Sequence, residues 1–304
     1  MTIVFLESGG SATHGLEFYS SISGSVSTTT SGAHPTSPRS VTLTGNSGYM
    51  ERSSVCSDTG GRISLWFRVA LLTNGATIPI RLVSIAGGIA SGSQFGLRWK
   101  TDGSGILELV DAGTGTAIAA ASNAVSVDTW KHLAIAWTRT SSSVNRYKLW
   151  LGDGVSDVLE MDVTNTTWTS PCDSLVLSLG SGNAVTPQFC HVYADDVSDL
   201  SYPGDIRVTY KAPNALNTNN FDTLLGSGTN RFDRVSDRPL STTNGIQHAA
   251  TSDVQENFGI QAPNQGDVDI TGQTVLGYCG WVFAKRGELD TRYLQNIGTV
   301  HSKT

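Results

Sequence analysis

Large apolar residues alternate with small or polar ones along much of the first 200 residues. In residues 133–137 every second side chain is large and apolar, and residues 147–151 repeat this pattern. A period of two predicts strands, because successive side chains of a strand point to opposite faces of a sheet. The polar residues 138–145 between the two runs predict the loop of a hairpin. Ala134 and Ala136 lie on the other face of the first strand, and their small size predicts that this face is covered as well.

Further strands follow from the same alternation, and they predict the fold class. Residues 61–72, 78–87 and 95–110 alternate in this way, and no long amphipathic helix pattern occurs. We therefore expect about a dozen strands in the first 200 residues, arranged as a two-sheet β-sandwich of jelly-roll type. Residues 22–40 are rich in Ser, Thr, Gly and Pro, and this composition predicts a long surface loop.

A change in composition places a domain boundary at Pro203–Gly204. Beyond it Asn, Gly, Asp and Thr become frequent and aromatic residues become sparser. The chain is thus predicted to be all-β, with a sandwich over residues 1–203 and a smaller, loop-rich β module over residues 204–304.

Composition disfavours several classes of protein. With 38% hydrophobic and 15% charged residues, the 304-residue chain is not expected to be disordered. Lys and Arg form no cluster and the net charge is −6, which disfavours nucleic-acid binding. No run approaches the roughly 20 apolar residues of a membrane span, and the apolar residues 3–6 are too few for a signal peptide. We expect neither membrane insertion nor export.

The sequence contains no spacing typical of a metal centre or a catalytic triad. The cysteines Cys56, Cys172, Cys190 and Cys279 show no CxxC or Cys/His ligand spacing, so no zinc site is expected. Without an export signal, free thiols are favoured over a Cys172–Cys190 disulfide. No G-x-S-x-G motif occurs. The six histidines lie in unrelated contexts: His14, His34, His132, His191, His248 and His301.

Two groups of carboxylates are candidates for a site. Glu160 and Asp162 lie on one face of a predicted strand, as in glycoside hydrolases, but no third carboxylate follows at the right spacing. A solvated strand face is the favoured interpretation. Asp195, Asp196 and Asp199 offer oxygen ligands for Ca²⁺, although a turn at the end of a strand is favoured. No catalytic or cofactor-binding residue is predicted, and the identity of any metal ligand stays open.

Three tryptophans, Trp66, Trp99 and Trp150, occupy alternating positions of predicted strands. If they faced solvent, they could stack on sugars. Packing against the second domain or a neighbouring subunit is the favoured interpretation, because such aromatic surfaces commonly anchor interfaces.

Two sets of motifs resemble known families. Residues 130–134 (WKHLA) and 149–154 (LWLGDG) resemble the laminin-G-like, or concanavalin A-like, jelly roll, in which the His of this motif is structural. A longer series is similar to a family of tailed-bacteriophage virion proteins, although ESGG stands where that family has DGF. The matching segments, in order, are residues 1–6, 38–41 (PRSV), 195–197 (DDV), 204–208 (GDIRV) and 230–237.

The second resemblance implies a non-enzymatic structural component of a phage virion, such as a tail, tail-fibre or head decoration protein. It also implies assembly in the bacterial host cytoplasm, other virion proteins as partners and a homo-oligomer, with a trimer expected first. Because that family usually continues with more strands, the resemblance further implies that the module over residues 204–304 is either shortened or completed by another chain. The alternative is a carbohydrate-binding module that recognises a host-surface glycan at a tail tip or fibre. A glycan depolymerase using Glu160 is the third hypothesis.

Overall fold

The computed structural model describes a defined subset of the chain. This subset comprises residues 3–7, 19, 21–37, 39–52, 59–69, 80–83, 94–100, 104–111, 116–141, 144–165, 174–178, 187–207, 213–216, 223–225, 245–247 and 258–260. The chain divides into two compact units, Met1–Lys211 and Ala212–Thr304. The sequence-based boundary at 203–204 lies a few residues earlier, because residues 204–207 contact the first unit through side chains described below.

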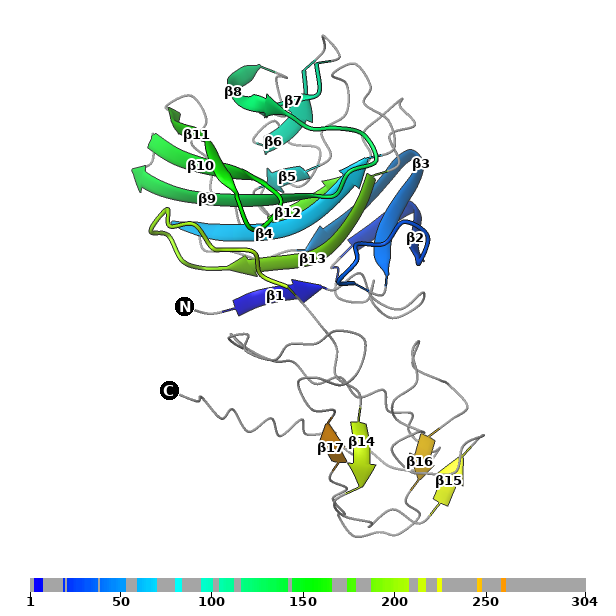
Figure 1. The fold of residues 1–304 in the computed structure, drawn as a ribbon. Coiled ribbons are helices and arrows are strands. Elements are labelled where there is room, and N and C mark those ends of the chain that lie inside the picture. The colour runs from blue at the N-terminus through cyan, green and yellow to red at the C-terminus, as the bar shows by residue number, and fades with distance from the viewer. Residues whose placement is uncertain are drawn as a thin grey trace. The chain divides into compact units, whose positions relative to one another are not determined.

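The described part of the first unit forms one antiparallel sheet that folds over on itself (Figure 1). Its strands follow the order β11-β10-β9-β4-β13-β3-β12-β5-β6-β7-β8, with β1 beside β13 and β2 beside β3. Their bounds are β1 Ile3–Glu7, β2 Ser21–Thr29, β3 Ser40–Arg52, β4 Gly60–Val69, β5 Ile80–Val83, β6 Gln94–Trp99, β7 Ile106–Asp111, β8 Ala117–Ala124, β9 Lys131–Ser141, β10 Val144–Gly152, β11 Val158–Asn165, β12 Ser174–Ser178 and β13 Pro187–Asp195.

The long strand β3 is the corner at which one layer becomes the other. Its first half pairs with β13 through Val41 and Thr42, whereas residues 49–52 pair with β12. One layer therefore contains β11, β10, β9, β4 and β13, and the other contains β12, β5, β6, β7 and β8. At the far ends of the strand order, Glu160 of β11 accepts hydrogen bonds from two backbone amides of β8, which joins the layers there. The result is a jelly-roll, concanavalin A-like β-sandwich.

The core lies between the two layers and is built from the alternating residues that the sequence predicts. Leu65 and Phe67 of β4 and Leu133 and Ile135 of β9 are all buried in it. The ring centroids of Phe67 and Trp99 lie 6.3 Å apart and connect the two layers. Burial of side chains of this size stabilises the fold by about 1.5–3 kcal/mol each.

Two predicted loops are shorter than expected. Residues 22–40 include strand β2, which pairs with β3 along most of its length, so the expected long loop is wrong there. Among the described strands the Ser- and Thr-rich β2 pairs only with β3, and its polar side chains are mostly exposed. The expected hairpin loop over 138–145 is also too long, since β9 extends to Ser141 and β10 begins at Val144.

The second unit is described only at four short strands. β14 (Pro213–Leu216) pairs with β17 (Phe258–Ile260), and β15 (Thr223–Leu225) pairs with β16 (Gly245–Gln247), both antiparallel. All helices and strands assigned among the described residues of both units are strands, in agreement with the predicted all-β fold class. Within the described residues there is no helix of sufficient length and hydrophobicity to cross a membrane.

Candidate functional site

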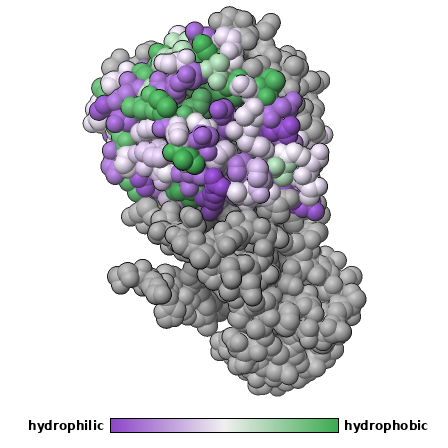
Figure 2. All heavy atoms as spheres, viewed as in Figure 1, coloured by the Kyte–Doolittle hydropathy of each residue, from purple (hydrophilic) through white to green (hydrophobic). Residues whose placement is uncertain are grey.

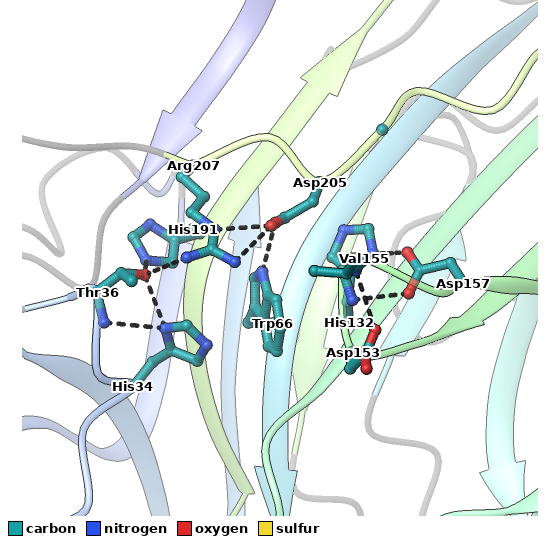
Figure 3. A network of polar contacts seen from close by, with 12 residues as sticks. His34, Thr36, Trp66, His132, Asp153, Val155, Asp157, His191, Asp205 and Arg207 are labelled. Carbon is teal, nitrogen blue, oxygen red and sulfur yellow. Dashed lines mark hydrogen bonds and ion pairs between the residues drawn. The ribbon is translucent and has the colours of Figure 1, made fainter. Parts of the chain in front are cut away.

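The face of β4 and β9 that points away from the core carries the candidate site. Because Leu65 and Leu133 enter the core, their neighbours Ser64, Trp66 and His132 point to the opposite, outer face. These three residues are nevertheless buried, and only 4% of Trp66 is exposed. Their cover comes from residues 196–207, which we call the crossing segment. Figure 3 shows the polar side chains of this region in a row across the strands.

Small side chains make room for the crossing segment. Ala134 and Ala136 of β9 pack with Trp150 of β10, and Leu200 of the crossing segment packs against this group. The covered outer face that the two alanines predict is thereby confirmed. Trp150 is buried here rather than presented to solvent.

A buried ion pair fixes the start of the crossing segment. Arg62 donates from Nε and Nη2 to the fully buried carboxylate of Asp195, with a shortest distance of 2.6 Å. Tyr193 donates its hydroxyl to the same carboxylate at 2.6 Å. The hydrogen bond to Asp195 raises the pKa of Arg62, and burial together with Asp195 raises the pKa of Tyr193. Arg62 also donates from Nη1 to Ser201 at 2.6 Å, which ties the middle of the segment down.

Further along, three side chains are connected in the order of a serine–histidine–aspartate triad. Ser64 Oγ lies 2.8 Å from His132 Nε2, and His132 Nδ1 is hydrogen-bonded to Asp157 Oδ2. A serine nucleophile must reach its substrate. Here Ser64 is fully buried, and its hydroxyl donates to the backbone carbonyl of Gly204 at 3.2 Å. The crossing segment thus occupies the space in front of the serine.

Asp157 also anchors an exposed surface turn. Its Oδ1 accepts the Gly154 amide at 2.8 Å, and its Oδ2 accepts the hydroxyl of Tyr202. Burial raises the pKa of the Asp157 carboxyl, but the hydrogen bonds from His132 and Tyr202 outweigh it, so the pKa lies below its ordinary value. Burial and the bond to Asp157 raise the pKa of Tyr202, which keeps this phenol protonated. The turn and the crossing segment are therefore joined through one carboxylate.

The end of the crossing segment is held by Trp66. Trp66 Nε1 donates to Asp205 Oδ1 at 2.7 Å, and Arg207 pairs with Asp205 at 2.6 Å. The Arg207 guanidinium lies 5.3 Å from the centroid of the Trp66 ring, within the range of a cation–π contact. Gly154 of the turn packs on the same tryptophan: its φ is +81°, and an added Cβ would lie 2.6 Å from Trp66.

Two histidines complete the network beside Trp66. The His34 ring lies 4.2 Å from the Trp66 ring and 5.6 Å from the His191 ring. Thr36 Oγ1 lies between the two histidines, 2.9 Å from His34 Nδ1 and 3.1 Å from His191 Nε2. Burial and the positive charge of Arg207 lower the pKa of His34 from 6.5 to about 4, so its ring is neutral at neutral pH.

The sequence-based candidates have different surroundings from those expected of a catalytic site. Glu160 accepts hydrogen bonds from β8, and Asp162 pairs with Arg146 at 2.8 Å. The oxygens of Asp195, a candidate for Ca²⁺, are already bound by Arg62 and Tyr193. Trp66, Trp99 and Trp150 are buried, so none of them offers a face to a sugar. His14, His248, His301, Cys56, Cys172 and Cys279 lie outside the described residues.

The sequence does not indicate that the residues of the outer face lie close together. The W-x-H motif marks His132, and the similarity over 204–208 marks the segment that holds Asp205 and Arg207. Neither motif indicates that these residues meet. Thr36 and Asp157 belong to polar turns, and only the fold brings them together with partners far away in the sequence.

No protein-family model matches the chain, and no curated protein matches it. Several solved structures are similar to it. An endo-β-1,4-glucuronan lyase from Trichoderma reesei is 10% identical, with a TM-score of 0.47 over 66% of this chain and 99% of the lyase. A carbohydrate esterase from the Shiga toxin-encoding bacteriophage phi24B is 16% identical, with a TM-score of 0.38 over 62% and 98% of the two chains. The carbohydrate binding module CBM66 from Bacillus subtilis is 12% identical, with a TM-score of 0.34 over 52% and 86%. At these identities the named activities do not transfer to this chain.

Proposed function

We propose that the sandwich is a non-catalytic module that binds carbohydrate on the surface formed by Tyr202 and the turn 152–157. The observation that carries this proposal is the state of Tyr202. Among the large aromatic residues that the structure describes, Tyr202 has the highest exposed fraction, 39%. Its hydroxyl is held by a hydrogen bond to the buried Asp157. The ring is thus held in one orientation with part of its surface open, and such preorganisation lowers the entropy lost on binding.

The surroundings of Tyr202 suit a sugar. Asp153 and Ser156 of the turn and Asp199 and Ser201 of the crossing segment are exposed and carry carboxylate or hydroxyl oxygens. Two of these are locally ordered, because Asp153 accepts the Ser156 amide at 2.7 Å and Asp199 accepts the Ser201 amide at 2.9 Å. An apolar ring beside a few fixed polar groups is the usual composition of a small-molecule site.

The buried network supports the absence of catalysis. Ser64, His132 and Asp157 have the order of a catalytic triad, but all three are enclosed and joined by hydrogen bonds through His132. A general base must be within hydrogen-bond reach of the proton that it removes. With the crossing segment in place, we expect no substrate to reach these groups.

A glycan array probed with the full chain tests the proposal. We expect binding to a subset of glycans. Tyr202→Leu, which removes the ring, should weaken it at least about tenfold, or about 1.4 kcal/mol, whereas Tyr202→Phe, which keeps the ring and loses the hydrogen bond to Asp157, should weaken it less. Ile22→Ala on β2 is the control, because Ile22 is also an exposed apolar residue. Binding by none of the proteins, or equal binding by the Phe and Leu variants, would contradict the proposal.

A second candidate function is assembly into a phage virion, as the resemblance of the sequence implies. A separate observation favours it: Val158 and Leu159 of β11 are 53% and 45% exposed, and β11 pairs only with β10 among the described strands. Exposed aliphatic side chains on an edge strand are typical of protein contacts. In the view of Figure 2, hydrophobic side chains form small groups among polar ones.

The oligomeric state distinguishes the second candidate from the first. We expect light scattering to detect a homo-oligomer, with a trimer first. The double variant Val158→Asp and Leu159→Asp should dissociate it, because two charges would enter an apolar contact. A monomeric wild-type chain, or an oligomer that the double variant leaves intact, would exclude assembly through β11.

A further inference from the structure

We propose that His34, Cys190 and His191 form a binding site for Zn²⁺. Their ligand atoms all lie within 4.8 Å of one another, and all three residues are buried. Imidazole nitrogen and thiolate sulfur are the donors that Zn²⁺ prefers, whereas Ca²⁺ and Mg²⁺ require oxygen. With Zn–N and Zn–S distances of about 2.0–2.3 Å, tetrahedral ligands lie about 3.3–3.8 Å apart. Closure of the site on the ion thus requires movements of about 1 Å.

A bulge in β13 brings two of the ligands to the same side. Successive residues of a regular strand point to opposite faces. Cys190 pairs with Trp66 and the pairing resumes at Tyr193 with Ser64, so residues 191 and 192 of β13 lie opposite the single residue 65 of β4. His191 has φ of +50°, a conformation that is uncommon for residues other than glycine. The side chains of Cys190 and His191 therefore both lie on the outer face, as they must if they are to bind the same ion.

The third ligand and its support come from the loop after β2. His34 lies in residues 30–37, and Thr36 in the same loop contacts one nitrogen of each histidine ring. Histidines that bind metal usually hydrogen-bond through their other nitrogen, which fixes the ring. We therefore assign His34 Nε2 and His191 Nδ1 as ligands. His34 Nδ1 accepts the Thr36 amide at 3.2 Å, so the neutral ring carries its proton on Nε2 when no ion is bound. Binding through Nε2 requires that this proton moves to Nδ1 and that the hydrogen bond from the amide is given up.

The charge balance permits a cation. Cys190 would bind as the thiolate and release its proton to solvent, and a water molecule would complete four ligands. The nearest positive charge is that of Arg207, and it is paired with Asp205 at 2.6 Å. The ligands lie far apart in the sequence, so the absence of a Cys/His spacing motif does not exclude this site.

The proposal can be tested with Co²⁺, a spectroscopic substitute for Zn²⁺. The full chain is first reduced and treated with a chelator, and Co²⁺ is then titrated into it. We expect the visible bands of tetrahedral Co²⁺ with thiolate-to-cobalt charge transfer in the near ultraviolet, saturating at one ion per chain, and their loss when Zn²⁺ is added. Cys190→Ser should abolish the charge-transfer band, while the control Cys172→Ser should keep it. Thr36→Val should weaken Co²⁺ binding about 10–100-fold, as expected for a group that orients ligands.

The same titration can overturn the proposal. No charge-transfer band in the wild-type chain, or a band that persists in Cys190→Ser, would show that these residues do not bind the ion. Circular dichroism without metal checks that each variant is folded. If Cys190→Ser is unfolded, His34→Gln decides instead: a tenfold or greater loss of Co²⁺ affinity supports the site, and unchanged affinity excludes it.

Discussion

Replacement of Asp157 by Asn tests the role assigned to the outer-face network. The carboxylate is almost fully enclosed and accepts hydrogen bonds from His132, Tyr202 and the Gly154 amide. Asn removes the charge and places an NH₂ group opposite one set of donors. Breaking a buried pair by removal of one partner costs about 3–5 kcal/mol. Two hydrogen bonds to a charged group, at about 1.5–3 kcal/mol each, give a similar sum.

The assay is chemical denaturation of the full chain followed by tryptophan fluorescence, supported by thermal unfolding. A loss of about 3–5 kcal/mol corresponds to a Tm lowered by about 6–20 °C in a unit of this size. The matched control is Asp153→Asn in the same turn, since Asp153 is exposed and Asn keeps the Oδ1 that accepts the Val155 and Ser156 amides. We expect the control to unfold at nearly the same denaturant concentration as the wild type, because Asp153 is exposed. Equal stabilities of the two variants would refute the reasoning.

Three further predictions follow from the same region. Gly154→Ala should lower the free energy of unfolding by about 2–5 kcal/mol, because the new Cβ would meet Trp66 and the backbone has positive φ; urea unfolding measures it. A fluorophosphonate probe should leave Ser64 unlabelled, as judged by mass spectrometry, and labelling would show that the crossing segment opens. The pKa of Asp157 lies below its ordinary 3.8. Its stabilising contribution is thus complete above pH of about 4–5 and lost as the pH falls through the lowered pKa. Asp157→Asn should therefore flatten the acid limb of the stability profile, and an unchanged slope would contradict this.

The strands of the core could be predicted because their signal is local. In β4 and β9 the large apolar residues recur at every second position, and nothing else in the sequence competes with that pattern. The two alanines of β9 even indicate the covered outer face. In contrast, β2 carries Ser and Thr at most positions, because it pairs only with β3 among the described strands and its residues are mostly exposed. A polar strand of this kind has the composition of a loop, and so the sequence predicts a loop.

The candidate site could not be predicted, because its contacts join residues that are distant in the sequence. Thr36 meets His191 across 155 positions, and Arg207 meets Thr36 across 171. The bulge that turns Cys190 and His191 to one face depends on how β13 pairs with β4. Glu160 and Asp162 illustrate the converse case. Their spacing indicates a carboxylate pair, but their partners on β8 and β10 give each of them a structural contact.

The most direct test of the central claim is a calorimetric titration with a glycan selected on the array. It measures the affinity of the full chain for this glycan in the wild type and in Tyr202→Leu. We expect one binding site per chain and an affinity at least about tenfold weaker in the variant, with circular dichroism showing that the variant is folded. The same affinity in both proteins, or hydrolysis of the glycan during the titration, would contradict a non-catalytic module that binds through Tyr202.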